Sequence, residues 1–253
     1  MGSRGPLFTV ITVTYNAEKW LEQTVLSVGE QVGVSLEYLI IDGGSKDGTL
    51  EIIRRYPEIV TAWVSEPDKG LYDAMNKGLR KATGEYVLFL NAGDTLQEKD
   101  CIRQLSEIAL AYDFPDIIYG ETDLVNAKGE FIGHRRLKAP ENLTWKTFRW
   151  GMLVCHQAFI VRRKMAPLYD LTYRFSADFD WCIRCMKQAG LIVNSRLRLV
   201  NYLYEGMTTA NRRASLKERY RIMQKYYGKI PVALLHIWFA MRFYWAKCVK
   251  KAV

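Results

Sequence analysis

Three apolar segments in the first half of the chain each end in a short polar stretch, and this pattern constrains the fold more than any other feature. The segments are 7–14, 37–42 and 86–90, and the stretches that end them are Thr14-Tyr15-Asn16, Asp42-Gly43-Gly44-Ser45 and Asn91-Ala92-Gly93-Asp94. Such runs predict strands buried on both faces. Because the carboxyl ends of parallel strands meet at one edge, we expect the three polar stretches to share one crevice.

Helices are expected between these strands, and the alternation predicts a doubly wound, mostly parallel α/β sheet with right-handed crossovers. The expected helices run from a cap at Asn16 to about Val28, then 49–56 and 71–81, with a further strand at 59–65. After Asp94 the rhythm changes. There we expect a helix at 97–111, strands at 117–119 and 155–161, a hairpin turn at 126–129, a helix at 179–189, and a helical, basic chain from 211 onward.

Composition supports a folded protein with an anionic partner. Hydrophobic residues make up 49% and charged residues 25% of the 253 residues, which is ordinary for a globular chain. The net charge of +9 favours a nucleotide, a phosphosugar, a nucleic acid or an acidic lipid surface. Five cysteines without a regular pattern do not form a disulfide framework, and no signal peptide is recognisable, so we expect a cytoplasmic protein.

The polar strand ends suit a nucleoside diphosphate. Tyr15 offers a flat face to a base, and Asp42 can accept a hydrogen bond from a base or a ribose hydroxyl. Asp94 can hold Mg²⁺ or Mn²⁺ through a hard oxygen ligand. Two familiar phosphate cradles are excluded by spacing, because the glycines at 43–48 lack the lysine of a P-loop and no G-x-G-x-x-G follows the first strand.

Five stretches carry a family resemblance. They are VITVTYNAEKWLEQTVLSV, IIDGGSKDGT, SEPDKGLYDAMNKGLRKATGEYVLFLNAGD, CHQAFIVRR and FSADFDW. From about Leu7 to Thr209 the chain resembles the inverting glycosyltransferases of family 2, and within them the WcaE-like branch of colanic acid and other exopolysaccharide assembly. The resemblance implies a GT-A-type doubly wound, mostly parallel sheet with a C-terminal helical extension.

The resemblance also implies roles for particular residues. Asp178 falls at the place of the catalytic base, and Asn91-Ala92-Gly93-Asp94 at the place of the metal-binding D-x-D motif, with Asp94 as the metal ligand. Tyr15 and Asp42 would contact base and ribose, and Asp73 and Asn76 the donor sugar. The full set assigned to donor or substrate binding is Thr14, Tyr15, Asn16, Asp42, Asp73, Asn76, Asn91, Ala92, His156 and Asp180.

Some of these assignments carry alternatives. Asp180 is interpreted as an orienting or helix-start carboxylate, and His156 either touches substrate or is a hydrogen-bonded core histidine. The family often has a second aspartate where this chain has Gly43, so the choice between uridine and guanosine stays open. Asn91 and Gly93 replace carboxylates, which weakens the expected metal site.

The implied function is sugar transfer from a UDP- or GDP-linked donor to a hydroxyl of a saccharide, in particular a lipid-linked one, in bacterial surface polysaccharide synthesis. The reaction would be inverting and metal-assisted, with a hexosyl or deoxyhexosyl group transferred. The domain is expected to span 7–210, with a donor half at 7–95 and an acceptor half at 96–210, followed by a basic amphipathic tail at 211–253.

Two other classes of function fit the sequence less well. A sugar-phosphate nucleotidyltransferase normally shows a glycine-rich basic loop soon after the first strand, and TVTYNAEKW lacks one. A non-enzymatic nucleotide- or RNA-binding protein needs aromatic residues interleaved with Lys and Arg on one surface, whereas the aromatics here lie mostly in apolar runs. No nucleic acid partner is therefore expected.

The tail from Pro231 to Val253 has two open interpretations. On a helix, His236, Lys247, Lys250 and Lys251 share one narrow face, and the rest is largely apolar and aromatic. The segment is too short and too often interrupted to span a bilayer. It either lies in the interface on the inner face of the cytoplasmic membrane, as a peripheral anchor, or packs as a core or dimer helix.

Overall fold

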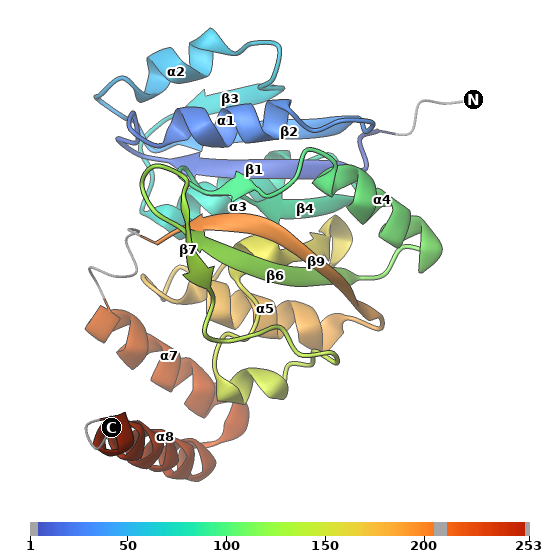
Figure 1. Ribbon diagram of the computed structural model, residues 1–253. Helices are drawn as coiled ribbons and strands as arrows, with labels where there is room; N and C mark the ends of the chain where they lie inside the picture. Colours follow the sequence, from blue (N-terminus) through green and yellow to red (C-terminus); the bar gives the residue numbers. More distant parts are fainter. Residues whose placement is uncertain (1–4, 205–211, 251–253) are drawn as a thin grey trace.

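The protein, described here by a computed structural model over residues 5–204 and 212–250, is built on one continuous mixed sheet (Figure 1). Within these residues the strand order is β3-β2-β1-β4-β8-β6-β9-β5, and β7 pairs with β6. The first four strands of this order are parallel, with bounds β3 Ala62–Ser65, β2 Leu36–Asp42, β1 Phe8–Thr14 and β4 Tyr86–Phe89. The predicted doubly wound α/β half is confirmed.

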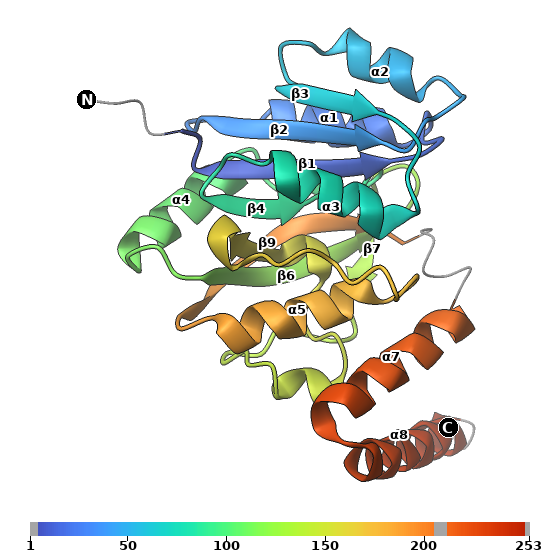
Figure 2. The same cartoon turned by 180° about the vertical axis from the view of Figure 1, so that it is seen from behind.

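Helices cover both faces of this parallel half because alternate strand residues point to opposite faces. On one face, Ile11 and Val13 pack with α3 (Leu71–Lys81) and α5 (Ala177–Gln188). On the other face, Phe8 and Val10 pack in a core that includes three further helices, namely α1 (Leu21–Gly29), α2 (Thr49–Arg55) and α4 (Cys101–Ala111). The view from behind in Figure 2 shows α3 in front of the sheet, where it contacts β1 and β2.

The second half of the sheet mixes directions. β8 runs antiparallel to both β4 and β6, β6 is parallel to β9, and β9 is antiparallel to β5. The bounds are β5 Thr95–Leu96, β6 Ile117–Val125, β7 Phe131–His134, β8 Phe159–Arg162 and β9 Ile192–Leu203, with short 3₁₀ helices η1 Thr147–Trp150, η2 His156–Ala158 and η3 Arg163–Met165. The strand expected at 155–161 is therefore wrong over its first part, where η2 replaces it.

Asn16 does not cap a helix, contrary to expectation. Its backbone has a φ of 49°, a left-handed conformation that asparagine tolerates better than most residues. Its amide donates to Ser45 Oγ and its side-chain oxygen accepts from the Lys46 amide, while α1 begins only at Leu21. Asn16 thus ties the end of β1 to the loop after β2.

Two helices follow the sheet. They are α7 (Arg212–Tyr227) and α8 (Lys229–Lys250), joined at Gly228, whose φ is 86°. Figures 1 and 2 show α7 beside α5 and α8 at the edge of the molecule. The helical extension is confirmed over 212–250, whereas Lys251 lies outside the described residues. In the described part of the chain, no helix is long and apolar enough to cross a membrane.

Candidate active site

A cleft of about 600 Å³ opens at the carboxyl edge of β1 and β4. The structure brings six of the predicted residues together in its lining, and these are Thr14, Tyr15, Asn16, Asn91, Ala92 and Asp94. Tyr15 is 62% exposed, so its ring is free to stack against a ligand. The expected convergence of polar strand ends is thus present for the first and third of the three stretches.

Asp94 is held at the base of the cleft by a tight turn. Gly93 has a φ of 101°, and a Cβ on it would lie 2.6 Å from Leu203 Cδ2, so the turn requires glycine. Thr24 from α1 accepts a hydrogen bond from the Gly93 amide and donates one to the Asp94 carbonyl. The turn is therefore fixed from a neighbouring helix.

The Asp94 carboxylate is 3% exposed and is already hydrogen-bonded. Oδ1 accepts from the Leu203 amide at 2.9 Å, and Oδ2 accepts from Gln157 Nε2 at 2.8 Å. Burial raises the pKa of Asp94 to about 7, against the opposing effect of these two hydrogen bonds. A cation or another positive group at this point would favour the ionised form.

Asn91 offers a second side-chain oxygen in the cleft lining. Its Oδ1 atom is buried and has no hydrogen-bond partner among the described residues, which is a costly state unless a ligand or water satisfies it. No group of three or more His, Cys, Asp or Glu side chains in the described ranges could hold a metal ion. Asn91 and Asp94 therefore fit a divalent cation only if phosphate and water oxygens complete its coordination.

Asp178 lies in the first turn of α5 and contacts α3. Its Oδ1 accepts from the Tyr72 hydroxyl at 3.1 Å and from the Phe179 amide at 2.9 Å. Over residues 5–204 and 212–250, no donor reaches Oδ2. Asp178 does not itself line the cleft. Phe175, three residues before Asp178 in the chain, does line it, and so does Leu71, which precedes Tyr72.

Asp42 and Asp73 do not point into the cleft, unlike the sequence-based expectation. Asp42 is fully buried, and its carboxylate accepts from the amides of Gly44 and Ser45 and from the hydroxyls of Ser45 and Ser65. It therefore shapes the loop after β2 and has no exposed atom to offer a base or ribose. Asp73 accepts from the Lys69 amide at 3.0 Å, before the start of α3.

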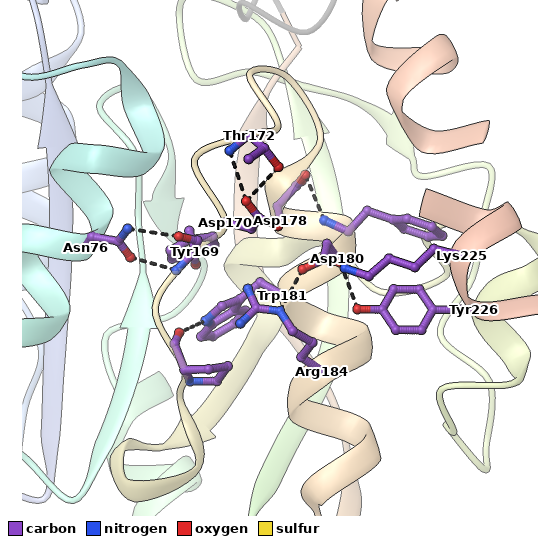
Figure 3. Close-up of polar contacts among 12 residues, drawn as sticks. Asn76, Tyr169, Asp170, Thr172, Asp178, Asp180, Trp181, Arg184, Lys225 and Tyr226 are labelled. Carbon is purple, nitrogen blue, oxygen red and sulfur yellow. Dashed lines mark hydrogen bonds and ion pairs between the residues drawn. The ribbon is translucent and has the colours of Figure 1, made fainter. Parts of the chain in front are cut away.

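Asn76, His156 and Asp180 are buried and do not line the cleft. Figure 3 shows the hydrogen bonds of Asn76 and Asp180. The Asn76 amide pairs with the main-chain N–H and C=O of Tyr169. His156 Nε2 is hydrogen-bonded to the Tyr169 hydroxyl, and burial lowers the pKa of His156 to about 4, although the nearby Asp178 carboxylate acts in the other direction. His156 is thus a neutral core histidine, one of the two interpretations of the sequence.

Asp180 is fully buried in a polar network (Figure 3). Its carboxylate accepts from Arg184 Nε at 2.6 Å, from Lys225 Nζ at 3.1 Å and from the Tyr226 hydroxyl at 2.7 Å. Two of these partners are on α7, so Asp180 joins the C-terminal extension to α5. A fully desolvated carboxylate paired in this way serves the packing of the two helices.

Sequence reasoning missed four polar or charged residues of the cleft. They are Asp68, Gln157, Arg174 and Tyr202. The one sequence feature connected with Asp68 is the glycine at position 43. Any larger residue there would place a Cβ 2.4 Å from Asp68 Oδ2. The carboxylate of Asp68 thus fills the space that a side chain at position 43 would occupy, next to the ring of Tyr15.

Comparison with known proteins agrees with this geometry. Residues 9–167 match the family model "Glycosyl transferase family 2". A PGL/p-HBAD biosynthesis glycosyltransferase of Mycobacterium bovis is 32% identical over 193 residues, which cover 74% of this chain and 72% of that protein. The putative teichuronic acid biosynthesis glycosyltransferase TuaG of Bacillus subtilis is 36% identical over 190 residues, covering 72% of this chain and 73% of that one.

Solved structures show the same fold. Residues 1–349 of Staphylococcus aureus TarS in complex with UDP superpose with a TM-score of 0.68 at 19% identity. The match covers 86% of this chain and 63% of the TarS chain. The complex of TarS 1–349 with UDP-GlcNAc gives 0.68 at 20% identity, over 90% of this chain and 66% of that one. The GT-A-type expectation for the fold is confirmed. Matched over more than half of its length by the family model, the chain belongs to glycosyltransferase family 2 and is a glycosyltransferase.

Proposed function

We propose that this glycosyltransferase transfers a hexosyl or deoxyhexosyl group from a nucleoside-diphosphate donor to a hydroxyl of a saccharide, with inversion, in bacterial surface polysaccharide synthesis. The cleft carries this proposal, because it joins an exposed aromatic ring, Tyr15, to the oxygen pair of Asn91 and Asp94. The TarS structures were solved with UDP and UDP-GlcNAc, and the relatives are named for PGL/p-HBAD and teichuronic acid biosynthesis, which supports a nucleotide-sugar donor and a glycan acceptor. The finer WcaE-like placement stays a prediction.

The nucleoside would bind between Tyr15 and Asp68. The exposed Tyr15 ring offers a stacking face, and Asp68 Oδ2 is a hydrogen-bond acceptor beside it, since Oδ1 already accepts from the Gly70 amide at 2.7 Å. Both residues line the cleft, whereas Asp42 is enclosed. Asp68 therefore takes the role of base or ribose acceptor that the sequence assigned to Asp42.

The diphosphate would bind beside Asn91 and Asp94. When bound there, Mg²⁺ or Mn²⁺ would supply positive charge to the leaving diphosphate. The unpartnered Asn91 Oδ1 and the Asp94 carboxylate would hold the cation, and Gln157 and the Leu203 amide keep that carboxylate in one orientation. A single carboxylate and an amide leave most coordination positions to the donor and to water.

Asp178 would act as the general base for the acceptor hydroxyl. Tyr72 and the Phe179 amide hold Oδ1, which directs Oδ2 to the incoming proton. Burial first, and then the neighbouring Asp178 carboxylate, raise the pKa of Tyr72, so its hydroxyl remains a donor at neutral pH. Attack on the side of the sugar opposite the diphosphate inverts the anomeric centre.

The acceptor would be lipid-linked and reached at a membrane surface on which α8 lies. Ile230, Leu234, Ile237, Trp238 and Met241 are exposed at helical spacing, which forms one apolar face on α8. Over 212–250 the only acidic residue is Glu218, against many Lys and Arg residues. An apolar face beside strong positive charge suits an anionic bilayer on the inner face of the cytoplasmic membrane.

Cosedimentation with lipid vesicles tests the membrane proposal. The protein should pellet with vesicles rich in anionic lipid and much less with zwitterionic ones, and Leu234→Glu with Ile237→Glu should abolish binding. Leu110→Glu, a change at an exposed leucine of α4, is the control. Self-association that the α8 variant abolishes, without vesicle binding, would show a dimer helix instead.

Turnover of nucleotide sugars tests the reaction. UDP- and GDP-linked sugars are incubated with the protein, with Mn²⁺, with Mg²⁺ or with EDTA, and released nucleoside diphosphate is measured. We expect release from one nucleotide class, stimulated by the cation and lost in Asp94→Asn. Release of pyrophosphate from a nucleoside triphosphate and a sugar phosphate would instead identify the nucleotidyltransferase alternative.

A further inference from the structure

Glu218 on α7 binds the main chain that leads into α5. Its Oε1 accepts from the Arg174 amide at 2.9 Å, and its Oε2 accepts from the amides of Phe175 at 2.7 Å and Ser176 at 3.0 Å. Three consecutive N–H groups therefore converge on one carboxylate. Because these amides stand just before a helix, they have no intrahelical acceptor and their dipoles favour a negative charge.

Further contacts make α7 a rigid support for this segment. The Ser176 hydroxyl meets both the hydroxyl and the carbonyl of Ser215, and the pair is buried. One turn further along α5, the buried Asp180 pairs with Lys225 and Tyr226 of α7, as Figure 3 shows. The start of α5 is thus held from α7 at several points, with Glu218 at the end nearest the cleft.

The segment that Glu218 holds places a positively charged side chain, Arg174, in the cleft lining. Arg174 lines the cleft together with Asp68 and Asp94, and it is the sole Lys or Arg in the lining drawn from the described residues. Its guanidinium forms no ion pair within residues 5–204 and 212–250, and it lies over the Phe175 ring, with 5.5 Å from Cζ to the ring centroid. An exposed, unpaired guanidinium is well suited to two phosphate oxygens.

We propose that Arg174 binds the diphosphate of the donor and that Glu218 is a positioning residue, which sets Arg174 by fixing its main chain from α7. The inference rests on the proposed function, because it assumes a nucleoside diphosphate in this cleft. It assigns part of the stabilisation of the leaving diphosphate to the positive charge of Arg174, at a site where few side chains could hold a metal ion. It also gives the C-terminal extension a role in donor binding.

Binding of the nucleoside diphosphate, compared with the nucleoside, tests the proposal without turnover. Calorimetry at fixed Mg²⁺ measures UDP against uridine, and GDP against guanosine, on the full chain. Arg174→Ala should weaken diphosphate binding about ten- to a hundredfold, as expected for a lost charge-assisted contact, and leave nucleoside binding unchanged. Arg174→Lys should recover part of the loss.

Glu218→Ala should weaken diphosphate binding less than Arg174→Ala does, again with no effect on the nucleoside. In the Arg174→Ala background it should add little, because its effect passes through Arg174. Glu218→Gln, which keeps an acceptor oxygen and the shape of the side chain, should retain more affinity. Lys217→Gln, on the exposed side of the same helix, is the control.

The outcomes distinguish a failure of the proposed function from a failure of the inference about Arg174 and Glu218. If the parent protein binds neither UDP nor GDP, the proposed function fails and this inference fails with it. If the parent binds one of them and Arg174→Ala binds it equally well, only the inference is overturned. Additive losses in the double variant, or equal losses for nucleoside and diphosphate, would show that Glu218 acts through general stability; should Glu218→Ala fail to fold, the Glu218→Gln double variant decides the point.

Discussion

The Tyr72 hydroxyl donates a hydrogen bond to Asp178 across the boundary between α3 and α5. The two residues are far apart in the sequence, and the bond joins α3 to the proposed catalytic base. Tyr72 is also stacked on Tyr169, with ring centroids 5.5 Å apart, so its position is fixed by packing. The orientation of Asp178 therefore depends on a side chain of the neighbouring helix.

Removing this hydroxyl should lower both turnover and stability. Tyr72→Phe keeps the ring stack and deletes one hydrogen bond to a charged group, which is worth about 1.5–3 kcal/mol. We expect kcat to fall about tenfold or more, with donor KM almost unchanged. Steady-state kinetics and urea unfolding measure both effects.

Tyr119→Phe is the matched control for this variant. The Tyr119 hydroxyl is a donor too, but its acceptors are the main-chain carbonyls of Pro140 and Glu141, outside the cleft lining. The Tyr119→Phe variant should lose about 1 kcal/mol of unfolding free energy and keep the kcat of the parent. A Tyr72→Phe enzyme as fast as the parent would show that Asp178 needs no help from α3.

Gly43 controls the place of Asp68 in the cleft. In Gly43→Ala the new Cβ would stand 2.4 Å from Asp68 Oδ2, and since that atom is the end of a side chain, Asp68 can rotate away at little cost in stability. The nucleoside would then lose its acceptor, and binding of UDP or GDP should weaken about tenfold. Thermal unfolding and calorimetry separate the two quantities.

Asp68→Asn should weaken binding to a similar degree if Asp68 accepts from the nucleoside. Gly190→Ala is the control, because its Cβ would meet Asp116 Oδ2 at an ordinary 3.5 Å. Unchanged binding in both Gly43→Ala and Asp68→Asn would remove Asp68 from the nucleoside site.

His156 should make the protein sensitive to acid. Burial lowers the pKa of His156 to about 4, below its unfolded value of about 6.5, so the unfolded chain binds a proton that the folded chain does not. The stability contributed by the neutral ring is present above pH 6.5 and is lost as the pH falls toward 4. At about 1.4 kcal/mol per pH unit, this single group can account for roughly 2–3 kcal/mol over that range.

His156→Gln should remove this dependence. Urea unfolding at pH 7.5 and at pH 4.5 should show a smaller difference in unfolding free energy for the variant than for the parent. The variant is less stable at pH 7.5, because the stacking on Phe89 and the edge-to-face contact with Trp181 are lost. His236→Gln on α8 is the control and should retain the parent's slope. An equal slope in parent and His156→Gln would mean that other groups cause the acid sensitivity.

Much of the fold could be predicted because, in the first half of the chain, the spacing of apolar residues agrees with the glycine and polar residues that end each helix or strand. The helix at 71–81 was predicted with both bounds correct, since its amphipathic pattern starts after Gly70 and ends before Ala82. Strand β9 was missed, because its first part alternates irregularly and includes Arg196 in a left-handed conformation, with φ 59°. Its pairing with β6 shifts register twice near that point, which no local pattern reveals.

The site could be predicted only in part, for reasons of tertiary structure. Strand ends place Tyr15 and Asp94 correctly, because a parallel sheet fixes where its carboxyl edge lies. Nothing local shows that the Asp42 carboxylate accepts four hydrogen bonds from its own loop and from Ser65, which keep it away from a ligand. Arg174 and Glu218 belong to segments that meet only when α7 packs on α5, and the sequence gives no sign of that contact.

The most direct test of the account is the turnover of Asp178→Asn. The substitution keeps the size of the side chain and its contact with Tyr72 while removing the proton acceptor, so kcat should fall about 10²- to 10⁴-fold with binding of UDP or GDP unchanged. Turnover within a few-fold of the parent, in a folded variant that still binds the diphosphate, would contradict the role of Asp178 and with it the proposed mechanism.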